Sequence, residues 1–249
     1  MEWWEDIYNR QIYFDLYEEE DTQLAEQQVQ QIVTLLHLTN GASMLDLCCG
    51  YGRHSIKLAQ RGFKVTGVDI SAKQIQHARE VAEIAHAQLD FQVADARKLN
   101  FQEAFDVVLN MFISLGFFKD DNENRQVLQG VFRALIPGGK LLIDFWNREK
   151  EIKNFQPLAC EKIRDIIVLK EWQFDALAGR LNWTNTVIFP DGRRESWDHS
   201  VRAYTITELK ALIEDAGLKF EAVYGSLAGE VYTIDSPAAI IVATKPLIN

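Results

Sequence analysis

Residues 44–52 read Met-Leu-Asp-Leu-Cys-Cys-Gly-Tyr-Gly, and a second apolar run, Val65-Thr-Gly-Val-Asp69, follows them. The first stretch joins a short apolar run, which is typical of a buried strand, to a turn with two glycines. Gly50 and Gly52 can take positive φ and have no Cβ, so this turn can approach a ligand closely. Asp69 ends the second run, where a carboxylate can accept hydrogen bonds from a ribose diol. The pattern predicts a site for a nucleoside cofactor.

Apolar runs with strand character alternate with runs of helical spacing on both sides of this turn. The strand-like runs are 44–48, 63–68, 89–93, 105–110 and 140–145, and the helical runs are 53–60, 71–85 and 124–135. This alternation predicts a parallel sheet with helices on both faces. Two further strands, 219–224 and 239–243, are joined by a loop too short for a crossover helix, which predicts an antiparallel hairpin at the end of the sheet.

A stretch of different character interrupts the alternation after residue 148. Three consecutive strands are expected there, at 166–174, 181–189 and 196–204. Ala178-Gly179 and Pro190-Asp-Gly192 supply the turns of this antiparallel meander. Apolar spacing at 23–36 also predicts a helix near the N-terminus. The expected units are an N-terminal helical lid segment (1–40), a cofactor-binding core (41–148 and 204–249) and an inserted antiparallel β substrate lid (149–203).

Composition narrows the possible functions. The chain has 249 residues, 47% of them hydrophobic, and a formal charge of −10, which argues against a general grip on nucleic acid. Cys48, Cys49 and Cys160 lack zinc-type spacing and are odd in number, so reduced thiols in a cytoplasmic protein are expected. We find no signal pattern, no apolar run long enough to span a membrane and no His/Asp/Glu cluster at metal-ligand spacing.

The glycine turn alone does not identify the nucleoside. Gly50-x-Gly52-x-x-Ser55 is one residue from the dinucleotide fingerprint Gly-x-Gly-x-x-Gly. Asp46, however, ends the preceding strand, where an acid would repel a pyrophosphate but attract the methionyl amine of S-adenosylmethionine (SAM). Asp95 follows the third strand, where it could read an adenine amino group. The antiparallel end of the sheet also argues against a second mononucleotide half. These features favour SAM over a nicotinamide cofactor.

Five ordered motifs carry a resemblance to a known family. They are Leu45–His54, Gly67–Ser71, Ala94–Arg97, Phe105–Asn110 and Leu135–Asp144. With these motifs the chain resembles the class I SAM-dependent methyltransferases over roughly residues 40–147 and 204–245. One departure is Cys48, where the family usually has glycine. The resemblance implies an α/β fold, with a Rossmann-like, mostly parallel sheet of seven strands that ends in an antiparallel hairpin.

The resemblance also implies roles for ten residues in cofactor binding. Those around the methionyl part are Asp46, Cys48, Gly50 and Gly52. Those at the ribose and the adenine are Asp69, Ile70, Asp95 and Ala96. Those under the sulfonium are Asn110 and Met111. Among these, Asp69 is expected to bind the ribose hydroxyls and Asp95 to accept from the adenine amino group.

The acceptor side of the site is less well defined by the sequence. Methyl transfer is an in-line displacement that needs alignment and water exclusion, with a base only if the nucleophile arrives protonated. His199 is the candidate base because its reference pKa is near neutral, although it could be an ordinary strand histidine. Residues that could contact the acceptor are Tyr13, Phe112, Phe117, Trp197, Arg202 and Tyr204. Structural alternatives stay open: Arg202 and Tyr204 could order a helix start, and Tyr13 could belong to a packing helix.

We therefore expect a SAM-dependent methyltransferase that acts on N or O of a small-molecule acceptor. Partners other than the acceptor, such as nucleic acid or a membrane, are not expected, and the oligomeric state is open. The alternatives are an NAD(P)-dependent oxidoreductase, a non-catalytic SAM-binding protein, and a methyltransferase that acts on RNA or protein.

Overall fold

The computed structural model describes residue 4 and residues 7–247, and for residues 19–21 it describes the main chain alone. Its main sheet has seven strands in the order β10-β11-β5-β4-β1-β2-β3. They are β1 (Ser43–Leu47), β2 (Lys64–Asp69), β3 (Asp90–Val93), β4 (Phe105–Asn110), β5 (Leu135–Phe145), β10 (Lys219–Tyr224) and β11 (Ala239–Thr244). The strand β11 runs opposite to the other six strands, so it pairs antiparallel with β10 and β5 while the remaining pairs are parallel. The expected mostly parallel sheet with an antiparallel C-terminal hairpin is confirmed.

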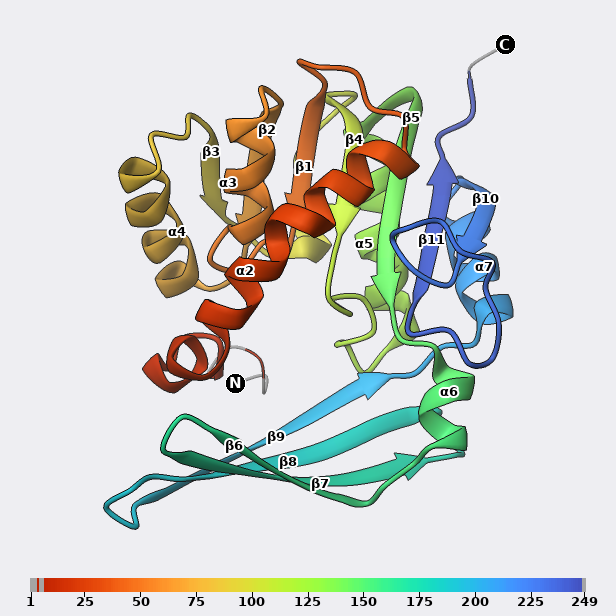
Figure 1. Ribbon diagram of the computed structural model, residues 1–249. Helices are drawn as coiled ribbons and strands as arrows, with labels where there is room; N and C mark the ends of the chain where they lie inside the picture. The colour runs from red at the N-terminus through yellow and green to blue at the C-terminus, as the bar shows by residue number, and fades with distance from the viewer. Residues whose placement is uncertain (1–3, 5–6, 248–249) are drawn as a thin grey trace.

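Helices cover both faces of this sheet (Figure 1). They are α2 (Gln11–Leu35), α3 (Arg53–Gln60), α4 (Ala72–Ile84), α5 (Asp121–Ala134) and α7 (Ile206–Asp215), with a short α6 (Arg148–Lys153) and a 3₁₀ turn, η1 (Ala96–Lys98). Ile32 of α2 and Leu58 of α3 pack in one buried cluster with Met44 of β1. On the other face, Val131 of α5 and Leu212 of α7 belong to a second buried cluster. Burial of these apolar stripes against the strands holds the layers together.

Two helix starts show how local sequence fixes the elements that border the site. The Ser71 hydroxyl caps α4 and accepts from the Gln74 N–H at 3.1 Å. Thr205 and Glu208 form a reciprocal capping box at the start of α7. Such caps satisfy N–H groups that have no partner inside the helix.

A second, antiparallel sheet lies between β5 and α7 in the chain. Its strands, in the order β6-β7-β8-β9, are β6 (Leu158–Ile163), β7 (Ile166–Asp175), β8 (Arg180–Ile188) and β9 (Arg194–Arg202). The sequence predicted three of these strands and missed β6. That strand is an edge strand without buried residues, so it lacks the apolar alternation of a half-buried strand. Figure 1 shows β5 pointing toward this four-stranded sheet, so the carboxyl ends of the parallel strands face it.

Helix α2 begins at Gln11, well before the expected start at residue 23. Its first turns, together with Ile7, pack against the four-stranded sheet. The buried members of this cluster are Ile7, Ile12, Leu16, Val168, Val187 and Trp197. The aromatic and acidic residues in this stretch hide the helical pattern, because their packing partners lie on a sheet that is remote in the sequence. Within the described ranges, no helix combines the length and apolar character that a membrane span requires.

Candidate active site

The turn after β1 has an unusual main-chain conformation. Cys48, Gly50 and Gly52 all have positive φ, at 63°, 56° and 77°. At Gly52 a Cβ would also lie 2.6 Å from the ring of Phe91, so only glycine fits there. Cys48 takes the left-handed conformation despite its side chain, which explains why glycine suits this position. The turn is a compact cradle of main chain at the end of β1, at the point where the strand order of the sheet reverses.

Asp69 ties this cradle to the start of α4. Its Oδ2 accepts from the Gly50 N–H at 2.9 Å, and its Oδ1 accepts from the Ser71 N–H at 2.9 Å. Burial raises the pKa of Asp69 above its usual value, although these main-chain bonds oppose the shift. The carboxylate is therefore fixed in place by two bonds, and its remaining lone pairs can accept from a ligand.

Asp46 is almost completely buried at the end of β1, with 2% of its surface exposed. The Ser55 hydroxyl donates to its Oδ2 at 2.5 Å. Burial raises the pKa of Asp46 to about 6, against the effects of the Ser55 bond and the Arg53 charge. A cationic group bound beside it would stabilise the ionised form.

Asp95 follows β3 and is held by a guanidinium. Arg97 donates from Nε to both carboxylate oxygens at 3.0 Å and from Nη2 to Oδ2 at 2.6 Å. Burial alone would raise the pKa of Asp95, but the bonds to Arg97 lower it overall. Arg97 also donates to Glu123 at 2.5 Å, so Asp95 is anchored to α5 through this arginine. Asp95 is thus a charged and rigidly held acceptor.

These residues meet in one cavity at the carboxyl ends of the parallel strands. It contains about 1100 Å³ of space, part of which is open to solvent. The predicted site residues that line it are Tyr13, Asp46, Cys48, Gly50, Asp69, Ile70, Asp95, Ala96, Met111, Phe112 and Phe117. Gly52 and Asn110 do not line the cavity. Gly52 precedes the first residue of α3, and Asn110 donates to the carbonyl of the lining residue Leu47. Trp197, His199, Arg202 and Tyr204 are absent from its described lining.

Asn110 is buried at the end of β4, next to β1. Its amide nitrogen donates to the Leu47 carbonyl at 3.2 Å, and its Oδ1 has no hydrogen-bond partner among the described residues. The Gln74 Oε1, on the cavity wall, is likewise buried without a described partner. Buried acceptors of this kind cost free energy until a donor reaches them. Of the two, only Gln74 lines the cavity, which therefore suits a ligand that carries a hydrogen-bond donor.

Aromatic rings close the cavity on the side of the N-terminus. Tyr8 stacks on Phe117, with ring centroids 6.2 Å apart and an interplanar angle of 5°. Trp4 meets Phe118 edge to face at 5.1 Å, and Tyr13 contacts Tyr8 in the same way at 5.0 Å. The sequence analysis missed Trp4 as a pocket residue, and the aromatic richness of residues 1–20 was the available signal. An aromatic enclosure excludes water and suits a cationic ligand.

A strained turn follows β4 at the open side of the cavity. Phe112 and Ile113 both have positive φ, at 56° and 58°. The Ile113 N–H donates to the Asp144 carbonyl at 3.0 Å, and the Arg53 guanidinium lies 3.9 Å from the centroid of the Phe112 ring. Burial raises the pKa of the Asp144 side chain to about 6, opposed by the Phe112 main chain and by Arg53. Strain of this kind persists where the surroundings hold it, often at functional sites.

The structure places His199 in the four-stranded sheet, outside the cavity lining. The Trp197 indole N–H donates to His199 Nε2 at 2.9 Å, and the Asn185 amide nitrogen lies 3.3 Å from the same atom. Because both groups are donors, Nε2 must be the unprotonated nitrogen. Burial lowers the pKa of His199 to about 3. His199 is therefore a weak base whose Nε2 lone pair is already engaged. The expectation that His199 serves as the catalytic base is corrected accordingly.

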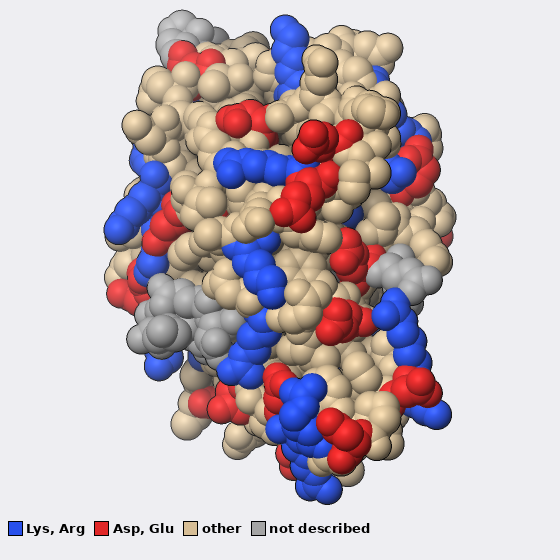
Figure 2. Space-filling view, turned by 90° about the vertical axis from the view of Figure 1, so that its left-hand side faces the viewer, with Lys and Arg blue, Asp and Glu red and all other residues tan. Residues whose placement is uncertain are grey.

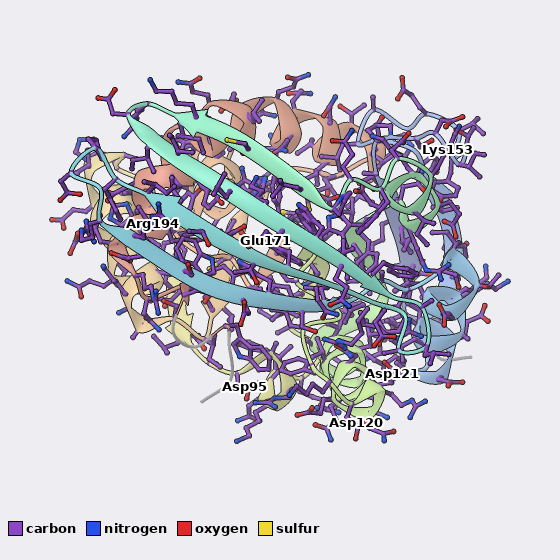
Figure 3. The ribbon with its side chains drawn as sticks, turned by 90° about the horizontal axis from the view of Figure 1, so that it is seen from below. Asp95, Asp120, Asp121, Lys153, Glu171 and Arg194 are labelled. Carbon is purple, nitrogen blue, oxygen red and sulfur yellow. The ribbon has the colours of Figure 1, made fainter. Side chains whose placement is uncertain are left out.

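Arg202 and Tyr204 are also engaged away from the cavity. The Tyr204 hydroxyl donates to Asp121 Oδ1 at 2.5 Å, and Arg202 donates to the Gly179 carbonyl at 2.9 Å and to Glu208 at 2.7 Å. Figure 3 shows Asp121 at the start of α5, beside the end of β9. These bonds fit the structural alternative, in which both residues order helix starts. Trp197 packs against the first turns of α2 instead of facing the cavity.

The four-stranded sheet reaches the cavity indirectly, through Arg180 at the start of β8. The guanidinium donates to the carbonyls of Phe118 at 3.0 Å and Phe117 at 3.3 Å, and to the Ser200 carbonyl at 2.8 Å. Gly116, with φ of 96°, lies so close to β9 that a Cβ there would be 2.8 Å from the Arg202 carbonyl. The four-stranded sheet, which was expected to form the substrate lid, therefore supports the cavity wall from outside. None of the described lining of the cavity comes from β6–β9.

Comparison with known proteins identifies the family. Residues 44–139 match the model of a methyltransferase domain. YqeM of Bacillus subtilis (strain 168), provisionally named a methyltransferase, is 30% identical over 186 residues, which is 72% of this chain and 74% of that protein. The chain belongs to the class I SAM-dependent methyltransferases. A dTDP-4-amino-2,3,4,6-tetradeoxy-D-glucose N,N-dimethyltransferase of Saccharopolyspora spinosa is 27% identical over 77% of each chain.

Solved structures of low sequence identity share the fold of this methyltransferase. The CcbJ methyltransferase of Streptomyces caelestis superimposes with a TM-score of 0.79 at 19% identity, over 89% of this chain and 90% of that one. CalS10, an amino pentose methyltransferase of Micromonospora echinaspora solved with SAM bound, gives a TM-score of 0.68 at 21% identity over 95% and 97%. Family membership gives SAM as the cofactor, and it sets aside the oxidoreductase alternative.

Proposed function

We propose that this methyltransferase transfers the methyl group of SAM to nitrogen or oxygen of a small-molecule acceptor. The observation that carries the proposal is the aromatic enclosure by Trp4, Tyr8, Tyr13 and Phe117, which narrows access to the carboxyl ends of the strands. The named activity of the Saccharopolyspora spinosa relative, on an amino sugar, supports the same class. On the face shown in Figure 2, basic side chains are interspersed with acidic ones. This face therefore lacks the continuous basic surface that binds nucleic acid.

The residue roles follow from the chemistry of the cavity wall. In this proposal Asp69 accepts from the ribose hydroxyls, and Asp46 holds the methionyl ammonium. Asp95, Ala96 and Ile70 surround the adenine, with the Asp95 carboxylate fixed by Arg97 as an acceptor. Met111, on the cavity wall, faces the reacting group, and the buried Asn110 lies behind it, where it donates to the Leu47 carbonyl. A cytoplasmic location and the oligomeric state stay predictions.

The bound cofactor supplies an activated methyl group on a neutral leaving group. The protein contributes alignment and dryness: the rings of Tyr8 and Phe117 exclude water, and the turn at Phe112 borders the acceptor. With a pKa near 3, His199 is too weak a base to deprotonate an ammonium. We propose that an amine acceptor loses its proton to solvent before it is enclosed, so that methylation of nitrogen needs no general base from the chain.

A labelling experiment tests the proposal. The protein is incubated with methyl-labelled SAM and fractionated bacterial metabolites, and label is traced into amines, alcohols and acids by mass spectrometry. We expect label on nitrogen or oxygen of a molecule small enough for the cavity. An otherwise identical reaction with Gly52→Ala, which places a Cβ against Phe91, is the control for site-dependent transfer. Label found only in RNA or protein fractions would refute a small-molecule acceptor.

A further inference from the structure

Gln74, on the first turns of α4, is a buried polar residue to which the sequence motifs assign no role. Its side chain lines the cavity, and 1% of its surface is exposed. The amide nitrogen donates to the Tyr8 carbonyl at 3.1 Å, while Oε1 has no hydrogen-bond partner among the described residues. Long polar side chains are seldom buried unless their polar atoms find partners. The open acceptor therefore points to a ligand.

The orientation of this amide is fixed by its partner. A carbonyl can only accept, so the nitrogen of Gln74 must face Tyr8 and the oxygen must face the opposite way. The oxygen lies 3.6 Å from the position that a Cβ on Gly50 would occupy. The Gly50 N–H in turn donates to Asp69 at 2.9 Å. An amide oxygen and a carboxylate thus flank one glycine of the cradle.

We propose that the Gln74 Oε1 accepts a hydrogen bond from one ribose hydroxyl of the cofactor, beside Asp69. A vicinal diol offers two donors, and Gly50 lies between two acceptors that could take one each. Two other donor groups of the cofactor, the methionyl ammonium and the adenine amino group, are assigned to Asp46 and Asp95, which lie at the ends of different strands. The inference rests on the proposed placement of the cofactor and adds a residue to it.

The same side chain ties the ribose to the aromatic enclosure. Ser71 Oγ also donates to the Tyr8 carbonyl, at 3.1 Å, so this carbonyl receives two bonds from the start of α4. The ring of Tyr8 stacks on Phe117 across the cavity. Gln74 thereby joins the ligand on one side of its amide to the N-terminal wall on the other. It is a binding residue for the ribose and a positioning residue for Tyr8.

Calorimetric binding of S-adenosylhomocysteine and 5′-methylthioadenosine to Gln74→Met tests this inference. Gln76→Met is the matched control, because Gln76 lies on the same helix, is exposed and bonds to Glu80. We expect Gln74→Met to weaken both ligands about tenfold, as for the loss of one buried hydrogen bond, and Gln76→Met to leave both unchanged. Weakening of S-adenosylhomocysteine alone would overturn the ribose assignment, because methylthioadenosine lacks the amino acid.

The 2′-deoxy and 3′-deoxy forms of methylthioadenosine provide a second measurement that needs only the wild-type protein. Removal of one hydroxyl should weaken wild-type binding about tenfold but leave Gln74→Met binding unchanged. Equal sensitivity of the two proteins to both deoxy ligands would overturn the inference. If the variant does not fold, full wild-type affinity for both deoxy ligands would overturn it as well. Failure of the wild-type protein to bind S-adenosylhomocysteine at all would instead refute the proposed cofactor placement.

Discussion

The proposed cofactor site and the four-stranded sheet of this molecule are built on different principles. At the carboxyl ends of β1, β2 and β3, short segments place Asp46, Asp69 and Asp95 around one cavity. Asp69 and Asp95 each accept a hydrogen bond from the main chain two residues further on, and Asp46 lies just before the glycine turn. In the four-stranded sheet, by contrast, polar side chains bond to one another and do not line the cavity. This sheet contacts the cavity wall only indirectly, through Arg180 and through its packing against α2.

This contrast separates two ways in which a residue can serve a site. In the proposed placement, a side chain of the cofactor site acts by direct contact, so its loss should lower ligand affinity more than it lowers stability. A side chain in the four-stranded sheet acts by keeping the residues of the cavity wall in place. Its loss should therefore lower the stability of the protein and its affinity for the ligand together. The predictions below probe this difference.

Replacement of Asp69 by Ala should have the largest effect. It removes the proposed ribose acceptor and also leaves the N–H groups of Gly50 and Ser71 without their partner. We expect the affinity for S-adenosylhomocysteine to fall at least 100-fold, or about 3 kcal/mol, in a calorimetric titration. Asp198→Ala is the control, since this exposed carboxylate bonds Thr184 on the four-stranded sheet. Affinity within threefold of wild type would rule out the direct role of Asp69.

Replacement of Arg180 by Met should lower stability and affinity together. The change leaves the Phe117 and Phe118 carbonyls without a guanidinium and frees the wall on which Tyr8 stacks. We expect the free energy of unfolding to fall by about 2 kcal/mol and the dissociation constant for S-adenosylhomocysteine to rise about tenfold. Urea titration and calorimetry measure the two quantities.

Arg193→Met serves as the control for Arg180, because Arg193 lies at an exposed turn of the same sheet and pairs with Glu195. It should change neither quantity. Loss of stability in Arg180→Met with unchanged ligand affinity would show that the sheet stabilises the fold without shaping the cavity.

The sequence predicted most of the residues that meet in the cavity because the pattern that carries them is local. A strand, a glycine turn and an acid at the next strand end, as in Asp46 to Asp69, are set by near neighbours in the chain. His199 could not be judged in this way, since the Trp197 and Asn185 donors that occupy it depend on strand register. Trp4 was hidden for a related reason: its partner Phe118 lies on a loop that is remote in the sequence.

The pH dependence of cofactor binding should sharpen the role of Asp46. Burial raises its pKa to about 6 in the free protein, and a bound ammonium favours the ionised form. We expect the affinity for S-adenosylhomocysteine to be constant above pH 7 and to fall toward tenfold per unit below pH 6. The proton bound by Asp46 between pH 6 and 4 should stabilise the free protein over the same range, because the folded-state pKa is the higher one.

Asp144 needs to be separated from this effect, since burial also raises its pKa to about 6. It does not line the cavity, so Asp144→Asn should keep the pH dependence of binding, and Asp46→Asn should abolish it. Calorimetry in buffers of different ionisation enthalpy measures the proton uptake directly. An unchanged pH profile in Asp46→Asn would assign the ammonium to another group.

The smallest effect is expected at Cys48, where the chain departs from the usual glycine of its family. Cys48 has φ of 63°, a conformation that costs a side-chain residue about 1–2 kcal/mol, while glycine costs about 0.5–1 kcal/mol in the unfolded chain. Cys48→Gly should therefore stabilise the protein by about 0.5 kcal/mol and leave ligand affinity unchanged. The same substitution at Cys160, in strand β6, should destabilise it, because no left-handed strain is relieved there. A lower melting temperature for Cys48→Gly would mean that packing of the thiol outweighs the strain of the turn.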